Sequence, residues 1–221
     1  MSSSSRFEKI LLIDDEEAVR DSYRIIIEDG PYKGVPVAEK LGTLKEALTF
    51  SSFGDAAISD YLLKPSNYAG FNGEDLVLGW YKKRFPAILC TRYQSENILD
   101  FRTKRRWIPV ILEPGQLNAD SLAHSIELIR AEFRGQYSPQ RRPWRALVTF
   151  TNISDDGRNV GAVIPGWSGD EIELVLEKLP SLLAERLRSA FVRGECFRCF
   201  AKANLGVEDE RDLYLDDWEL T

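Results

Sequence analysis

Over the first 134 residues, short apolar runs alternate with stretches in which apolar residues recur at helical spacing. A continuous apolar run is typical of a strand buried on both faces of a parallel sheet. Apolar residues three or four positions apart, as at Val19, Tyr23, Ile26 and Ile27, are typical of an amphipathic helix. We expect strands at 7–13, 35–40, 55–61, 86–90 and 108–112, and helices at 18–28, 43–50, 74–83, 95–104 and 120–134. This alternation predicts an α/β fold, a (βα)5 doubly wound parallel sheet with helices on both faces.

After residue 143 the pattern changes. Residues 144–152 alternate apolar and polar side chains, as a half-buried strand does. Further strands are expected at 160–164, 171–176, 196–205 and 212–220, with one helix at 180–192 that begins at Pro180. The order βββαββ is that of a small α+β domain, and we expect a partly open barrel.

A stretch rich in proline, glycine and polar residues separates the two patterns. Residues 135–143 read GQYSPQRRP, which is typical of a linker. We therefore expect two domains, 1–134 and 144–221, joined by the linker 135–143.

The charges are distributed unevenly between these two parts. The chain has 29 basic and 35 acidic side chains, and residues 143–221 hold nine of the basic and fifteen of the acidic ones. The C-terminal part therefore carries the whole net charge of −6. Acidic clusters at 208–210 and 216–219 would repel phosphates, and the part lacks a basic recognition helix. These features disfavour nucleic acid as a partner, and we expect this domain to dock another protein.

Several classes of protein are excluded by simple features of the chain. No apolar run approaches the roughly 20 residues that span a bilayer. Residues 1–5 lack the features of a secretory signal, and three cysteines are too few for a disulfide framework. We expect a cytoplasmic protein with no membrane partner. There is no glycine-rich phosphate loop and no Ser-His-Asp arrangement, and His124 is expected to be a surface or packing residue, so we expect no enzyme.

Polar residues with useful chemistry follow the expected strands. Ligands of such sheets bind beyond the carboxyl ends of the strands. Carboxylates that converge there suit Mg²⁺, and an aspartate beside the metal can act as a nucleophile toward a phosphoryl group. The residues at these ends are Asp14, Asp15, Asp60, Thr91 and Glu113.

Residues 6–134 resemble the receiver domain of bacterial two-component response regulators. The resemblance depends on the run ILLIDDE at 10–16, on Asp60, Thr91 and Pro114 at the strand ends, and on Gly73 at the start of the third helix. It implies that Asp14, Asp15 and Asp60 bind Mg²⁺. It implies further that Asp60 accepts a phosphoryl group from a histidine kinase or a phosphotransfer protein, and that Thr91 contacts this group. Any enzymatic activity would be limited to self-phosphorylation and dephosphorylation, and a homodimer stays open.

Three features depart from the family. Glu113 stands where the family has a lysine, which reverses a charge near the phosphoryl group. Val110 replaces the usual aromatic switch residue, and the stretch from Asp60 to Gly73 is longer than usual. We hypothesise that Lys64, in that stretch, replaces the missing cation.

Two alternatives stay open at this point. Glu113 is also consistent with a degenerate receiver that works as a binding module without phosphorylation. Alternatively, the protein is an effector whose C-terminal domain binds a nucleotide or another small ligand. For residues 104–106 (KRR) we expect a solvated helix end, with partner docking as the alternative. For Trp167, Tyr214 and Trp218 we expect core positions, with a protein-docking face as the alternative.

Overall fold

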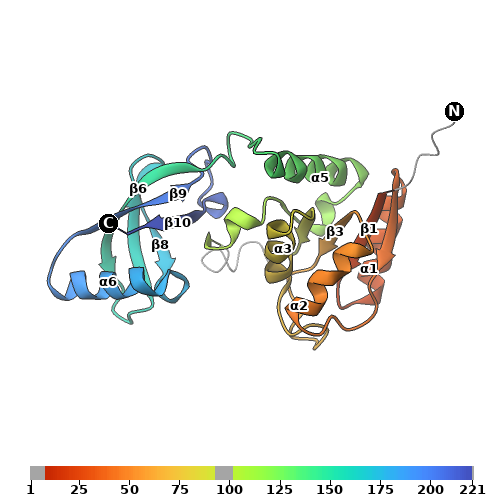
Figure 1. The fold of residues 1–221 in the computed structure, drawn as a ribbon, viewed down its shortest axis with the longest axis horizontal. Helices are drawn as coiled ribbons and strands as arrows, with labels where there is room; N and C mark the ends of the chain where they lie inside the picture. The colour runs from red at the N-terminus through yellow and green to blue at the C-terminus, as the bar shows by residue number, and fades with distance from the viewer. Residues whose placement is uncertain (1–7, 93–101, 221) are drawn as a thin grey trace. The chain divides into compact units, whose positions relative to one another are not determined.

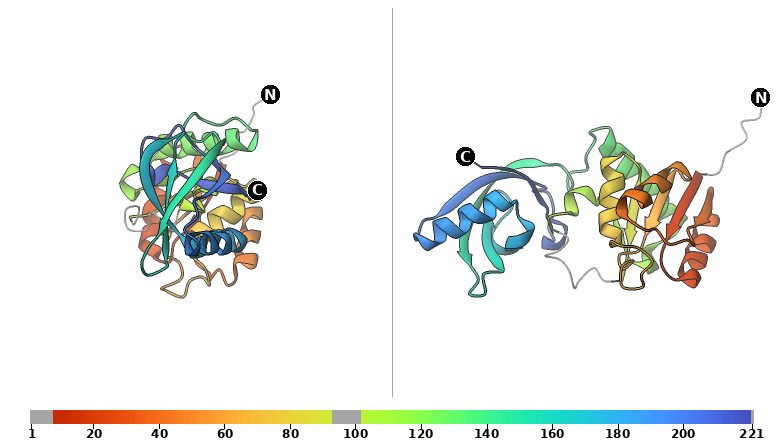
Figure 2. Two further views of the ribbon diagram at one scale, coloured as in Figure 1. Left: turned by 90° about the vertical axis from the view of Figure 1, so that its left-hand side faces the viewer. Right: turned by 60° about the horizontal axis from the view of Figure 1, so that its bottom comes forward.

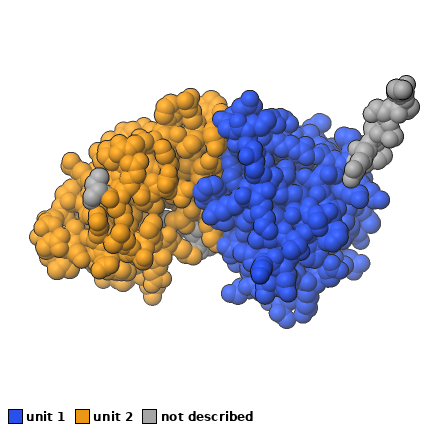
Figure 3. Space-filling model, viewed as in Figure 1, with its two compact units in different colours: residues 1–94, 107–136 blue, residues 95–106, 137–221 orange. Residues whose placement is uncertain are grey.

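A computed structural model of the protein describes residues 8–92 and 102–220 (Figure 1). The chain forms two compact units, which Figure 3 colours separately. The first comprises residues 1–94 and 107–136, and the second comprises residues 95–106 and 137–221. The change of unit at 136/137 falls inside the expected linker, whereas residues 95–106 group with the C-terminal part and not with the domain in which we expected them.

The first unit is built on a five-stranded parallel sheet. Its strands are β1 (Glu8–Ile13), β2 (Tyr32–Pro36), β3 (Ala56–Ser59), β4 (Ala87–Cys90) and β5 (Ile111–Leu112). All four pairings are parallel, and the order is β2-β1-β3-β4-β5. The predicted doubly wound sheet is confirmed, because the winding reverses between β1 and β3.

The helices of this unit are α1 (Glu17–Glu28), α2 (Leu44–Ala47), α3 (Gly73–Lys82) and α5 (Ala119–Phe133). A 3₁₀ helix at Leu48–Ser52 continues α2. Contacts join α1 to α5 and α2 to α3. The helix expected at 95–104 lies largely outside the described residues. Trp107 closes a 3₁₀ turn that begins at Arg105.

Burial on both faces of β1 explains why its sequence is continuously apolar. Ile10 and Leu12 belong to the core cluster that includes residues of α1 and α5. The alternate residues Leu11 and Ile13 are equally inaccessible to solvent. A strand that is buried on both faces cannot alternate apolar and polar residues. The continuous apolar sequence of β1 therefore predicted that this strand lies inside the sheet.

The long stretch between β3 and α3 is ordered by backbone contacts to the chain after β2. The Leu41 amide donates to the Tyr68 carbonyl at 2.9 Å, and the Gly70 amide donates to the Gly42 carbonyl at 3.0 Å. The buried Tyr68 hydroxyl donates to the Val37 carbonyl. These bonds fix the stretch beside the carboxyl edge of the sheet.

The second unit contains a five-stranded antiparallel sheet and one long helix, α6 (Ser181–Val192). Its strands are β6 (Trp144–Ile153), β7 (Asn159–Ile164), β8 (Ser168–Val175), β9 (Phe197–Ala203) and β10 (Leu215–Glu219). The predicted order βββαββ is confirmed. The sheet runs β10-β9-β6-β7-β8, and no pairing between described residues closes β8 onto β10.

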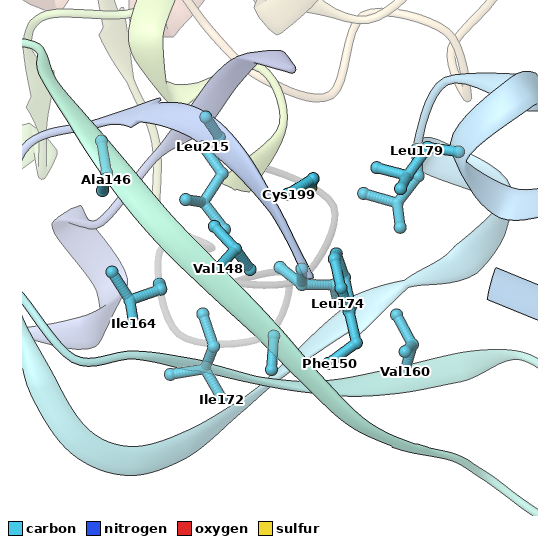
Figure 4. Packing of buried hydrophobic residues seen from close by; sticks show 14 of the residues in the cluster. Ala146, Val148, Phe150, Val160, Ile164, Ile172, Leu174, Leu179, Cys199 and Leu215 are labelled. Carbon is cyan, nitrogen blue, oxygen red and sulfur yellow. The ribbon is translucent and has the colours of Figure 1, made fainter. Parts of the chain in front are cut away.

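Apolar side chains from the strands gather on the sheet face that α6 covers (Figures 2 and 4). Val148, Phe150 and Leu174 are almost inaccessible to solvent. Tyr214 is fully buried, and Trp167 and Trp218 pack against this core, as expected. These three aromatic residues therefore stabilise the fold.

The sequence-based interpretation of residues 104–106 as a solvated helix end is wrong. Arg105 and Arg106 are only 7% and 8% exposed, and Arg102 is 1% exposed. Arg105 pairs with Asp212 at 2.7 Å, and Arg141 donates to the carbonyls of Arg105 at 3.0 Å and Arg106 at 2.7 Å. The segment is buried because the second unit supplies partners for its guanidinium groups, which composition cannot reveal.

Candidate functional site at the carboxyl edge of the parallel sheet

A pocket lies where β1 and β3 end side by side. Asp14 and Asp15 follow β1 directly, and Asp60 follows β3. The two strands pair in parallel up to Ile13 and Ser59, so the three carboxylates leave the sheet at the same edge. All three line one pocket. The structure thus brings together the residues that the sequence assigned to a metal site.

The backbone around Asp60 is fixed on every side. Its amide donates to the Ile13 carbonyl at 2.8 Å, which ties the end of β3 to β1. Its carboxylate Oδ2 accepts from the Leu62 amide at 2.8 Å. The Ser59 hydroxyl donates to the Asp60 carbonyl at 3.0 Å. The carboxylate is therefore held at the pocket in one orientation.

The carboxylates of this pocket disfavour one another's charge. Burial, with a smaller effect from the nearby charges of Asp60 and Asp15, raises the pKa of Asp14 to about 7, although a hydrogen bond from the Glu16 amide lowers it. Burial also raises the pKa of Asp60, opposed by bonds from the Tyr61 and Leu62 amides. A site that disfavours negative charge in this way favours a bound cation.

The chemistry of these donors fits Mg²⁺ in kind. Mg²⁺ takes one or two carboxylates and keeps several waters, and the pocket offers three carboxylates at an open edge. In the described part of the chain, no three His, Cys, Asp or Glu side chains are gathered closely enough to hold a metal by themselves. Asp14, Asp15 and Asp60 thus offer part of a coordination shell, which water and a phosphoryl oxygen would complete.

The other predicted residues do not line this pocket. Thr91 directly follows β4, its amide donates to the Leu112 carbonyl at 2.9 Å, and its side chain is buried. Glu113 is exposed and forms a capping box with Gln116 at the 3₁₀ turn Pro114–Gln116. Lys64 is exposed, while Leu62 and Pro65 on either side of it line the pocket.

Two basic residues that lie near the carboxylates were not identified from the sequence. Arg92, directly after Thr91, lines the pocket with Asp60. Arg20 is buried in α1, and its guanidinium donates to the Asp14 carbonyl. The sequence contains a feature that could have identified each of the two arginines. Arg92 follows a strand end, and Arg20 stands three and seven positions before Tyr23 and Ile27, on the buried face of α1.

No helix within residues 8–92 and 102–220 is long and apolar enough to cross a membrane.

No protein-family model matches this sequence, and no curated protein matches it. Solved structures of receiver domains are similar to its N-terminal part. One is the receiver domain of a modulated diguanylate cyclase from Desulfovibrio desulfuricans G20, with 20% identity and a TM-score of 0.46, which covers 58% of this chain and 97% of its own. Another is the receiver domain of an HD domain-containing protein from Pseudomonas fluorescens Pf-5, with 18% identity, a TM-score of 0.45 and coverage of 61% and 97%.

A third similar structure is the receiver domain of a putative LuxO repressor protein from Vibrio parahaemolyticus. It has 24% identity and a TM-score of 0.41, and the alignment covers 58% of this chain and 95% of that domain. These receiver domains match the N-terminal part of the chain and leave the C-terminal domain unassigned. The strand order β2-β1-β3-β4-β5 of the first unit is by itself that of a doubly wound α/β fold.

Proposed function

We propose that this protein is a response-regulator-like signalling protein whose first unit accepts a phosphoryl group at Asp60. The observation that carries the proposal is the pocket between β1 and β3, which Asp14, Asp15 and Asp60 line together. The donor is a phosphohistidine of a histidine kinase or of a phosphotransfer protein.

In this reaction a carboxylate oxygen of Asp60 attacks the phosphorus atom of the donor. The new O–P bond forms as the P–N bond of the phosphohistidine breaks, and the imidazole leaves with the electron pair. Asp14, Asp15 and Asp60 would hold Mg²⁺, which would supply positive charge that offsets the charge of the phosphoryl group. The Leu62 amide orients the nucleophile through its bond to Oδ2.

The orientation of Glu113 supports phosphorylation over the degenerate alternative. Its capping box with Gln116 directs the side chain toward the turn, and Glu113 is absent from the pocket lining. The negative charge of Glu113 would therefore repel a phosphoryl group on Asp60 only weakly, because repulsion falls with distance and with exposure to water. The proposed contact between Thr91 and a phosphoryl oxygen requires its buried hydroxyl to become accessible.

For the second unit we propose docking of another protein, in the cytoplasm. Trp167 and Trp218 pack against the core, and the edge strand β8 presents Asp170, Glu171 and Glu173 to solvent. An acidic sheet edge repels phosphate backbones and suits a basic protein surface.

Intact mass spectrometry of the full chain tests the phosphorylation. Incubation with acetyl phosphate and Mg²⁺ is expected to add about 80 Da, the mass of one phosphoryl group. Asp60→Asn should abolish the adduct, and Asp55→Asn, at a half-buried aspartate before β3 that lies outside the pocket lining, should preserve it. Failure of the wild type to form the adduct would support the degenerate receiver instead.

A further inference from the structure

The pocket around Asp60 is rich in carboxylates and contains one basic side chain. Its lining includes Asp14, Asp15, Glu16 and Asp60. Among the described residues that line it, Arg92 alone carries a positive charge. The phosphoryl group on Asp60 would add further negative charge to this site. A cation close to the phosphoryl group would therefore stabilise the phosphorylated state.

Neither of the two positions considered for a cation from the sequence, 64 and 113, reaches the pocket lining. Glu113, at the position where a cation was expected, carries the opposite charge and caps the turn at Pro114–Gln116. Lys64 points outward from a stretch that is fixed at Leu63 and Ala69, since the Ala69 amide donates to the Leu63 carbonyl at 3.2 Å. The hypothesis that Lys64 replaces the missing cation thus receives no support from the pocket.

We propose that Arg92 is the cation that contacts the phosphoryl group on Asp60. The inference rests on the proposed function, because it concerns the product of that reaction. Arg92 follows β4 and Asp60 follows β3, and these strands are neighbours that pair in parallel, so both residues leave the sheet at its carboxyl edge. A guanidinium offers five donors in a planar fork and binds phosphate oxygens through two of them at once.

The position of Arg92 suits a contact made only after phosphorylation. Its side chain is exposed, so it can adjust to the phosphoryl oxygens without loss of core packing. It also follows Thr91, whose amide ties β4 to β5 through the Leu112 carbonyl. An arginine that bonds to the phosphoryl group would therefore bring the end of β4 toward Asp60.

Four variants of the full chain test this role by intact mass after incubation with acetyl phosphate and Mg²⁺. In the step measured, the Asp60 carboxylate attacks phosphorus and the P–O bond to acetate breaks, so acetate leaves with the electron pair. Arg92→Gln is expected to lower the phosphorylated fraction or its lifetime about tenfold, because it removes a charged hydrogen-bond donor to the phosphoryl oxygens. Arg92→Lys should recover most of the loss because it keeps the charge. Lys64→Gln should behave as wild type, and Asp60→Asn should give no adduct.

The outcomes separate this inference from the proposed function. If the wild type forms no adduct, the proposed function fails. If the wild type and Arg92→Gln form equally stable adducts that Asp60→Asn abolishes, the function stands and the role of Arg92 is overturned. A loss in Lys64→Gln with none in Arg92→Gln would assign the cation to Lys64 instead. Thermal unfolding of each variant verifies that the fold is intact.

Discussion

Gly73 lies so close to Asp60 that a Cβ atom at position 73 would stand 1.7 Å from the Asp60 carbonyl oxygen. Its amide also donates to the Tyr61 carbonyl at 2.8 Å. The start of α3 therefore rests directly on the backbone of the proposed phosphoacceptor. No side chain larger than hydrogen fits here unless that backbone shifts.

Gly73→Ala is expected to destabilise the first unit by about 2 kcal/mol, the usual scale of overpacking at a rigid contact. It should also reduce phosphorylation at Asp60, because the carboxylate would move with its backbone. Denaturant unfolding and intact mass measure the two effects. Gly115→Ala is the matched control, since a Cβ at that position meets no atom within 4 Å. Equal stability of the two variants would contradict the close contact.

The raised pKa of Asp14 predicts a dependence of stability on pH. The folded protein holds a proton on Asp14 up to about pH 7, whereas the unfolded chain releases it near the ordinary value of 3.8. Over this window the folded state binds more protons, so the Asp14 contribution to stability falls as pH rises and is lost above about pH 7.

Asp14→Asn should therefore be more stable than wild type at pH 8, by about 2 kcal/mol or more, and similar to it at pH 4. Thermal or denaturant unfolding of both proteins at the two pH values measures the difference. Mg²⁺ should stabilise the wild type at pH 8 and have little effect on the variant. Parallel pH profiles for the two proteins would show that Asp14 is not the responsible group.

The guanidinium of Arg102 donates to the Glu173 carbonyl at 2.6 Å and pairs with Glu210. Arg102→Met keeps an apolar stem but leaves the Glu173 carbonyl without this donor, which should cost about 2 kcal/mol. Denaturant unfolding followed by tryptophan fluorescence measures the loss. Arg158→Met, at the exposed turn between β6 and β7, is the control and should change little. A loss of equal size in the control would contradict a structural role specific to Arg102.

Tyr68→Phe should cost about 1 kcal/mol, because it leaves the buried Val37 carbonyl without its donor. The stretch that carries Leu62 and Pro65 to the pocket should also exchange its amide hydrogens faster. Hydrogen exchange read by mass spectrometry tests this at the Leu41, Ala69 and Gly70 amides, which are bonded in the wild type. Unchanged protection there would mean that the hydroxyl does not hold the stretch.

The full chain is expected not to bind single-stranded DNA at about 0.15 M salt, where long-range attraction is screened within roughly 8 Å. Two basic side chains of the second sheet have acidic side chains beside them, which reduces their attraction for phosphates. Arg145 pairs with Glu219 at 2.8 Å, and Lys202 stands opposite Asp216 in the register. Fluorescence anisotropy with a labelled oligonucleotide tests this. Binding at that salt concentration, lost when the exposed Arg198 of β9 is replaced in Arg198→Glu, would overturn the protein-docking proposal.

The sequence by itself determined the parallel sheet and the residues at its carboxyl edge. A buried strand must be apolar at successive positions, so β1 and its terminal Asp14 and Asp15 were readable as one pattern. Asp60 could be placed in the same way because β3 is equally buried. The order of strands and helix in the second unit also followed from local periodicity.

Only the tertiary structure decided which charged side chains meet. Residues 104–106 were expected to be solvated, but Arg105 and Arg106 are buried, because partners far along the chain bond to this segment: Asp212 to the Arg105 guanidinium and Arg141 to the carbonyls of Arg105 and Arg106. Arg92, and neither Lys64 nor Glu113, lines the pocket. Apolar periodicity is a local property of the chain, whereas the pairing of charges depends on contacts between distant residues, which only the folded structure brings together.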